Sequence, residues 1–417
     1  MKPRVFTKGF NALLVTQFLG AANDNLLKQL IALQLVAPGI WAGAMGDGGQ
    51  GAITVIFTLP FLLLSGWSGQ LADRISKQQL SQWVKIAEVF IAVIALAALW
   101  KGSLLFSVTA LVLLSIQSTV FGPAKYGMIP EMMDKEALGP ANGAINMLTN
   151  IAIIVGGALG GVISDQYAGF TLLPGLVILV VAVAGTISSR YLQPLESSDP
   201  SSRVRGFPFS PYVSAFCMMA KVRHLVPYAL AWGFFYFVGV TVLQVNLDFK
   251  PLLNLTDTQA SLLNVPLVVG IGLGSGLAGC FCKEKIRMGL VPLGGIGIAV
   301  MLIALGSIQL TYIIVMAGLV LMGAFAGLYI VPLQSKVQEL SPEGQRGRVL
   351  GTSNFLTFAF VALGGAFYWL MRSQLAIGAQ VMLVISAVML ILCVVWITGV
   401  IRRAAVTSSE RAVKRDG

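Results

Sequence analysis

The chain has 417 residues, of which 56% are hydrophobic and only 11% charged, and its formal net charge is +11. A soluble protein of this length would carry far more charge, so the composition excludes the soluble class and predicts a polytopic membrane protein. About 20 apolar residues span a bilayer as one helix, and this chain has room for about a dozen such segments.

Twelve apolar segments are predicted to cross the membrane as helices, which makes the fold class all-α. In chain order they are 10–36, 50–72, 80–100, 103–123, 139–163, 169–190, 225–247, 258–282, 288–308, 311–334, 348–371 and 376–401. The edges at 123–139 and 334–348 are the least defined, because Pro and Gly interrupt the apolar pattern there.

The first segment carries two charges near its centre, Asp24 and Lys28. A charge at the bilayer centre costs about 2.5–3.5 kcal/mol on insertion scales, so both side chains are expected to face other helices or a wet cavity. Their four-residue spacing places them on one helix face. Two interpretations are open: an internal ion pair that locks this helix to a neighbour, or a hydrated site. The flanking amides of Asn23 and Asn25 favour the hydrated site.

The third segment also contains a lysine and a glutamate, Lys85 and Glu88, three residues apart. Lys85 either extends its long side chain to the membrane surface or faces a cavity. Glu88 lies deeper in the segment, so we expect it to face the cavity. Both are candidate substrate or coupling residues.

Basic residues are distributed unevenly between the predicted loops. The N-terminal tail and alternate loops hold 23 Lys and Arg residues, whereas the opposite loops hold only Lys101, Lys250 and Arg372. This positive-inside pattern predicts that both termini lie in the cytoplasm and that the number of spans is even. The positive charge therefore reports topology and attraction to anionic lipid, and it does not indicate nucleic-acid binding.

The two halves of the chain repeat each other at an offset of 208 residues. Nine of 28 ungapped positions are identical between 131–158 and 339–366. Chance similarity between apolar sequences is disfavoured, because the polar residues Glu131 and Asn146 take part in the match.

Two parallel six-helix halves joined by a long linker resemble the plan of the major facilitator superfamily. The expected domains are pseudo-symmetric bundles at 1–192 and 225–417, with a cytoplasmic linker at 193–224. Within the linker, residues 210–221 are apolar with a basic end. They are expected either to form a helix in the membrane interface or to extend the seventh span.

The loop after the second segment, Gly69-Gln-Leu-Ala-Asp73-Arg74-Ile-Ser-Lys77, resembles the signature of that superfamily. The resemblance implies that Gly69, Asp73 and Arg74 act in a cytoplasmic gate. Gly69 is expected to permit close approach of helices, and Asp73 is expected to sit at a helix N-terminus, where backbone N–H groups favour an anion.

The most distinctive string is Phe121-Gly-Pro-Ala-Lys125-Tyr126-Gly127-Met-Ile-Pro130-Glu131, followed by Ala141-Asn142-Gly143. Together with the Asn-Asp24-Asn25 context, it resembles the bacterial lysophospholipid transporter branch of the superfamily. The resemblance implies lysophospholipid transport from the outer to the inner leaflet of the inner membrane, where an acyltransferase restores the missing chain. Candidate residues for substrate or coupling are then Asp24, Asn25, Lys85, Glu88, Lys125 and Asn142.

Lys125 is predicted at the cytoplasmic mouth of the fourth helix, where its ammonium can attract a phosphate. A loop lysine that merely follows the positive-inside rule is the other interpretation. Because the charges within helices concentrate in the first half, we expect that half to bind the headgroup and the apolar second half to accommodate the acyl tail.

No catalytic or cofactor site is predicted. The only histidine, His224, is followed by Leu-Val-Pro-Tyr-Ala and so lacks the His-x-x-x-x-Asp motif of the acyltransferases. The four cysteines imply no disulfide, and Cys280 and Cys282 form a poor metal site. Two alternative functions stay open: export of another amphiphile or drug, and a non-transporting membrane scaffold for an acyltransferase.

Overall fold

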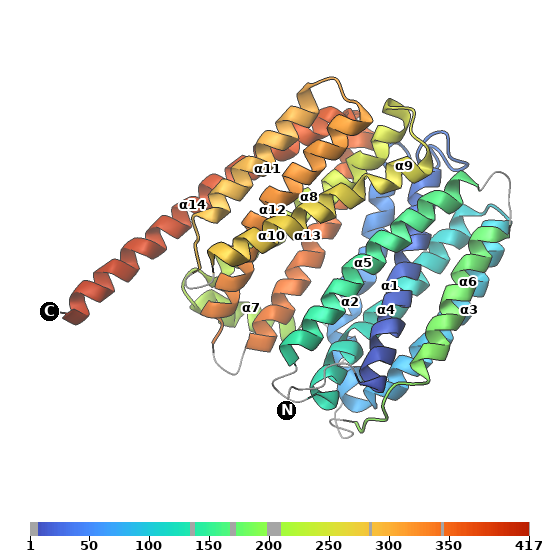
Figure 1. Cartoon of the computed structure of the whole chain (residues 1–417), viewed down its shortest axis with the longest axis horizontal. Coiled ribbons are helices and arrows are strands. Elements are labelled where there is room, and N and C mark those ends of the chain that lie inside the picture. The colour runs from blue at the N-terminus through green and yellow to red at the C-terminus, as the bar shows by residue number, and fades with distance from the viewer. Residues whose placement is uncertain are drawn as a thin grey trace. The chain divides into compact units, whose positions relative to one another are not determined.

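The computed structural model describes residues 7–133, 138–166, 172–197, 210–282, 286–342 and 346–416. Within these ranges every regular element is a helix (Figure 1), which confirms the all-α class. The helices are α1 (Lys8–Leu35), α2 (Gly49–Arg74), α3 (Lys77–Trp100), α4 (Leu104–Met132), α5 (Leu138–Asp165), α6 (Leu173–Ser189), α7 (Ser210–Lys221), α8 (Leu225–Leu252), α9 (Asp257–Leu262), α10 (Asn264–Phe281), α11 (Leu290–Ser307), α12 (Tyr312–Leu340), α13 (Arg346–Leu375) and α14 (Ala379–Asp416).

The twelve predicted spans correspond to these helices in order, with the eighth span divided into α9 and α10 and with α7 additional. Ten candidate spans in the described part of the chain are long and apolar enough to cross a membrane. The two remaining spans are α6, which has 17 residues, and α1, which carries Asp24 and Lys28. The chain is therefore a multi-pass membrane protein.

Two helices with internal prolines end later than predicted, α4 beyond residue 123 and α12 beyond residue 334. The fourth helix continues through Pro123 and Pro130 to Met132, and α12 continues through Pro332 to Leu340. Proline is tolerated inside membrane helices because neighbouring helices and local adjustments satisfy the freed backbone groups. Lys125 consequently lies inside α4, two turns before its end, and not at the mouth of the helix.

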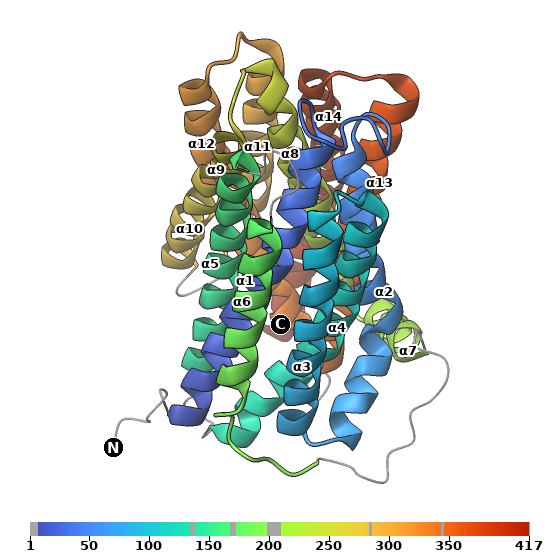
Figure 2. The ribbon, with the colours of Figure 1, turned by 90° about the vertical axis from the view of Figure 1, so that its right-hand side faces the viewer.

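The predicted linker contains the separate helix α7, visible as a short helix in Figure 2. It does not extend the seventh span, because His224, just before α8, has a left-handed backbone with φ of 67°. Residues 198–209 of the predicted linker lie outside the described residues. At the other end of the chain, α14 continues well beyond the predicted end at residue 401.

The chain divides into two compact units. The first comprises Met1–Ser210 together with Leu255–Leu262, and the second comprises Pro211–Asn254 and Leu263–Gly417. The repeat seen in the sequence is also present in the helices, since α4 begins at Leu104 and α12 at Tyr312, 208 residues apart.

In the first unit, α1 and α5 run side by side in parallel. The Gln17 amide donates to the Thr149 hydroxyl at 3.0 Å, and near the other end the Gln34 amide donates to the Ser164 hydroxyl at 2.7 Å. Close packing between these contacts depends on Gly156, where a Cβ would overlap the backbone of α1. These contacts fix the level of α1 side chains relative to α5.

The short helix α9 is held by the end of α5. The Asp165 carboxylate accepts the backbone N–H of Asp257 at 2.6 Å and of Thr258 at 2.9 Å. The Gln29 amide of α1 donates to Ser261 at 3.0 Å. Gly161 of α5 lies so close that a Cβ would come within 2.5 Å of the Ser261 hydroxyl oxygen. These contacts explain why residues 255–262 belong to the first unit although both flanking segments belong to the second.

Candidate functional site

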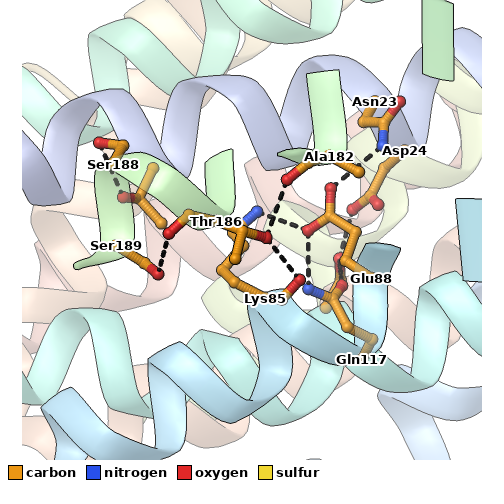
Figure 3. Close-up of polar contacts among 11 residues, drawn as sticks. Asn23, Asp24, Lys85, Glu88, Gln117, Ala182, Thr186, Ser188 and Ser189 are labelled. Atoms are coloured by element: carbon orange, nitrogen blue, oxygen red, sulfur yellow. Dashed lines mark hydrogen bonds and ion pairs between the residues drawn. The ribbon is translucent and has the colours of Figure 1, made fainter. Parts of the chain in front are cut away.

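The candidate site is a buried polar cluster inside the first unit (Figure 3). Its charged members come from two helices: Asp24 on α1, and Lys85 and Glu88 on α3. The side chains of Lys85 and Glu88 are 0% exposed, and Asp24 is 7% exposed. Three of the six residues that the sequence proposed for substrate or coupling are thus brought into one cluster.

Lys85 and Glu88 form an ion pair at the centre of the cluster. The Lys85 ammonium donates to Glu88 Oε2 at 2.6 Å, as their three-residue spacing on one helix face allows. Glu88 also accepts the Asn23 amide at 3.1 Å and the Gln117 amide at 3.0 Å. Removing two charges from water is tolerable only with such pairing and hydrogen bonding. Lys85 therefore does not reach the membrane surface, which excludes that interpretation of its position.

The Lys85 ammonium occupies a space that two glycines leave open. A Cβ at Gly20 of α1 would lie 2.5 Å from the Lys85 nitrogen, and one at Gly185 of α6 would lie 3.5 Å from it. The ammonium also lies 5.6 Å from the ring centroid of Phe121, within cation–π range. The Thr186 hydroxyl lies 2.8 Å from the Lys85 carbonyl oxygen and joins α6 to α3.

Asp24 is connected to the cluster by Ser118 of α4, and one of its carboxylate oxygens has no hydrogen-bond partner among the described residues. The Ser118 hydroxyl donates to Asp24 Oδ2 and lies 3.0 Å from Gln117 Oε1. Neither Asp24 Oδ1 nor Asn23 Oδ1 has a hydrogen-bond partner among the described residues, although both atoms are buried. Buried acceptors are seldom left unpaired, so these atoms offer binding capacity to a donor or cation.

Lys28 forms no direct ion pair with Asp24 in the described part of the chain, although the charge of Asp24 acts on its ammonium. The Lys28 ammonium lies 5.1 Å from the ring centroid of Phe57 on α2. The interpretation of the two residues as an internal ion pair is therefore wrong: four-residue spacing places them on one face of α1, but the lysine side chain extends towards α2.

Lys125 lies on the same face of α4 as Ser118, because seven residues make nearly two turns and a rise of about 10 Å. Its half-buried ammonium lies 4.9 Å from the ring centroid of Tyr126 and is attracted by the charge of Asp24. The Tyr126 hydroxyl donates to Asn146 of α5 at 3.0 Å. The site thus has an acidic and a basic part along one face of α4.

Asn25 and Asn142 lie outside the cluster. The Asn25 amide donates to the Ala21 carbonyl of its own helix at 2.8 Å. Asn142 is exposed near the beginning of α5. Given the parallel register that Gln17 and Thr149 fix, Asn142 lies about 20 Å along the helix axis from the level of Asp24.

The three predicted gate residues lie at or near the end of α2. Asp73 and Arg74 are exposed, and a Cβ at Gly69 would meet no atom within 4 Å. The close packing expected at Gly69 is therefore not seen, and the gate role of the three residues stays a prediction. The neighbouring Lys77 forms the ion pair of this region: it contacts Glu131 at 2.5 Å, and Gly127 leaves room for its side chain.

Sequence reasoning missed Gln117, Ser118 and the Lys77–Glu131 pair. Uncharged polar residues in an apolar helix do not show which neighbour they contact, so Gln117 and Ser118 could not be predicted from the sequence. Glu131 had a signal, because it is one of the polar residues that the internal repeat retains.

Two pockets of the second unit are lined by uncharged residues, in contrast to the charged cluster of the first unit. A small pocket of about 40 Å³ is lined by apolar side chains and one glycine, including Phe235, Val242, Leu267 and Met322. One ionic contact in this unit joins Arg372 Nε to Asp248 at 3.3 Å, and Tyr368 also donates to Asp248. A second, more exposed one joins Lys336 to Glu339 at 2.8 Å. A larger hollow of about 490 Å³ next to Leu252 and Gln380 has no charged residue in its lining.

Known proteins resemble this chain in sequence and in fold. The model of the Major Facilitator Superfamily matches residues 13–367. The lysophospholipid transporter LplT of Photorhabdus laumondii subsp. laumondii is 30% identical over 343 residues, covering 80% of this chain and 81% of that protein. The protein of the same name from Klebsiella pneumoniae strain 342 is 28% identical over 355 residues, covering 81% of this chain and 82% of the relative.

Two solved transporters share the fold at low sequence identity. A bacterial homologue of the human lysosomal transporter Spinster, in an inward-facing and unoccupied conformation, has a TM-score of 0.69 at 14% identity and covers 95% of this chain and 98% of its own. A POT family transporter bound to a thioalcohol-conjugated peptide has a TM-score of 0.67 at 12% identity and covers 95% and 96%. With the sequence matches, these likenesses show that the chain belongs to the major facilitator superfamily and, within it, to the lysophospholipid transporter family.

Proposed function

We propose that this transporter moves lysophospholipids from the outer to the inner leaflet of the bacterial inner membrane by alternating access, and so supplies them for re-acylation. The name of the relatives supports the substrate class. A lysophospholipid has one acyl tail and a phosphate-bearing head, which in the ethanolamine type carries both signs of charge. Its carrier has to offer buried groups of both signs and an apolar path.

The observation that carries the proposal is the open acceptor of Asp24 on the same side of the bundle as Lys125. Asp24 Oδ1 would accept a hydrogen bond from the head, and the Lys125 ammonium would attract the phosphate. Lys85 and Glu88 neutralise each other, so their role is to hold Asn23 and Gln117 in place. The headgroup site is thus a small acidic and basic pair supported by a neutral, buried network.

The contrast between the two units supports separate places for the head and the tail. In the first unit a charged cluster is buried between helices, whereas a small pocket of the second unit, apart from the ion pair at Asp248, is lined by apolar residues. An acyl chain gains free energy in apolar surroundings and a headgroup does not. We therefore assign the tail to the side of the second unit.

We assign re-acylation to a separate acyltransferase. The transporter itself is assigned no catalytic step. Acyltransferases of this kind use a His-x-x-x-x-Asp motif, and the sequence around His224 does not contain it. The placement of basic residues supports an inner-membrane protein with both termini in the cytoplasm.

The substrate assignment is tested by uptake in cells that lack their own lysophospholipid transporter. Cells that express the chain are given labelled lysophosphatidylethanolamine, and albumin then extracts label that remains in the outer leaflet. We expect protein-dependent protection of the lysolipid and none for labelled diacyl phosphatidylethanolamine. If the protein is present in the membrane and no lysolipid is protected, the assignment is wrong.

The role of Asp24 is tested through Ser118→Ala, which removes the hydroxyl that donates to it. A hydrogen bond to a charged group contributes about 1.5–3 kcal/mol, so we expect roughly tenfold slower uptake or more. Thr109→Val is the matched control, because the exposed Thr109 hydroxyl of the same helix donates only to its own backbone. Equal uptake by the two variants would remove Ser118 from the site.

A further inference from the structure

The linker helix α7 has an apolar face that packs on its own unit. Ala215 and Met219 on this face are 2% and 0% exposed. The Tyr212 ring stacks on the Phe355 ring of α13, with centroids 4.5 Å apart. This face fixes the orientation of α7 relative to α13, so the opposite sides of the helix face outward.

A second apolar stripe on α7 is exposed. Val213, Phe216, Cys217 and Ala220 are all exposed, with Val213 at 58% and Phe216 at 37%. Their spacing of three, one and three residues places them on one side of a helix. Ser214 and Lys221 lie on a third, polar side, about a quarter turn away. The helix thus has a docked face, an outward apolar face and a polar face.

The position of α7 in the chain places it at the membrane surface. It ends at Lys221, and the membrane-spanning helix α8 begins at Leu225. The four residue steps from Lys221 to Leu225 reach at most about 14 Å when extended. The end of α7 therefore lies within that distance of the beginning of a span.

The end of α7 is basic. Lys221 and Arg223 are both exposed. The pKa of His224 lies below its ordinary value, because partial burial and then the neighbouring Arg223 disfavour the imidazolium, so His224 adds no charge at neutral pH. An exposed apolar stripe next to paired cationic side chains is the pattern of helices that lie in the interface of an anionic membrane.

We propose that α7 is a lipid-binding surface: Val213, Phe216, Cys217 and Ala220 enter the boundary between headgroups and acyl chains, and Lys221 and Arg223 bind the phosphates of anionic lipids. The occupant is the leaflet on the side where α8 begins. This lipid contact is separate from the transported substrate and does not depend on it. Tyr212 of α7 stacks on Phe355 of α13, so the helix that binds lipid also packs directly against α13.

Cys217 allows a direct test in the full-length protein. The other cysteines are replaced (Cys280→Ser, Cys282→Ser and Cys393→Ala), and a nitroxide is attached to Cys217. The protein is placed in nanodiscs of phosphatidylcholine with or without phosphatidylglycerol. Collision of the label with oxygen, which enters lipid, is compared with collision with a water-soluble nickel chelate. The control label is at Ser214→Cys in a Cys217→Ala background, on the polar side of the same helix.

With phosphatidylglycerol, we expect the Cys217 label to collide at least several-fold more with oxygen than with nickel, and the Ser214→Cys label to show the reverse. Lys221→Gln with Arg223→Gln should shift the Cys217 label towards nickel, as should omission of phosphatidylglycerol. Equal nickel access at the two positions would overturn the proposal, because the stripe would then face water. Protection of Cys217 from both reagents would also overturn it, because protein would cover the stripe. Protection that is independent of phosphatidylglycerol and of the two basic residues would refute the anionic-lipid contact.

Discussion

A lysine ammonium inside an apolar bundle needs space as well as a counter-ion, and Gly20 provides the space. A Cβ at Gly20 would lie 2.5 Å from the Lys85 nitrogen, so a larger residue there would require the ammonium to move. Glu88 provides the counter-ion. Residue 20 therefore acts on Asp24 indirectly, through the pair that holds the neighbouring Asn23.

Gly20→Ala should displace Lys85 and weaken its contact with Glu88. Overpacking of this kind destabilises by about 1–3 kcal/mol, and we expect slower lysolipid uptake together with a lower melting temperature of the purified protein. Gly157→Ala is the matched control, because a Cβ at Gly157 would meet nothing within 4 Å. Similar melting temperatures for the two variants would show that the space at Gly20 is not needed.

Removing one partner of the buried Lys85–Glu88 pair should destabilise the protein more than removing both charges. Lys85→Met leaves Glu88 charged and without its cation, which destabilises by about 3–5 kcal/mol. Adding Glu88→Gln removes the remaining charge and keeps one of the two oxygens that accept from Asn23 and Gln117, so part of the stability should return. Thermal unfolding of the single and double variants measures this. A double variant that unfolds as early as the single variant would contradict the pairing.

At the site, the charged residues could be predicted from the sequence, whereas their hydrogen-bond partners could not. Asp24, Lys85 and Glu88 could be proposed because each charge is costly in an apolar segment. Their connection runs through Asn23, Gln117 and Ser118, which are neutral and leave hydropathy almost unchanged. Lys28 shows the same limit, since helical spacing gave its face but not the direction of its side chain.

At the scale of helices, hydropathy located the spans but not all of their ends. Apolar length alone predicts where a bilayer-spanning helix lies. At Pro123, Pro130 and Pro332 the helix continues, because a membrane helix surrounded by other helices tolerates proline. The division between α9 and α10 at Leu263 was not predicted, although Asn264 and Pro266 follow it directly and proline is a signal for a helix boundary.

The Asp165 carboxylate caps the start of α9 and should contribute to the stability of the protein. Asp165→Asn keeps the size of the side chain but replaces one oxygen that accepts a backbone N–H of α9. Loss of a helix cap costs about 0.5–2 kcal/mol, so the melting temperature should fall by a few degrees. Asp47→Asn, at an exposed turn, is the matched control and should leave stability unchanged. An unaltered melting temperature in both variants would show that the cap does not hold α9.

At the scale of the whole molecule, the two halves share their plan but not their chemistry. The repeat of 208 residues indicated two related bundles, and the helices α4 and α12 begin at that spacing. The halves differ where function is proposed, because the first unit joins Asp24 of α1 with Lys85 and Glu88 of α3 in one cluster, whereas the buried charges of the second unit, Asp248 and Lys250, lie on α8. Repetition of sequence therefore predicts architecture, whereas the departures from the repeat indicate the site.

Asp24 in this buried cluster is proposed to bind the lysophospholipid head. The most direct measurement is the affinity of the purified protein for lysophosphatidylethanolamine, compared between the unaltered chain, Asp24→Asn and the Asp47→Asn control. A lost hydrogen bond to a charged group should weaken binding roughly tenfold to a hundredfold for Asp24→Asn and leave the control unchanged. Equal affinity for all three proteins, each with an unaltered melting temperature, would contradict the claim.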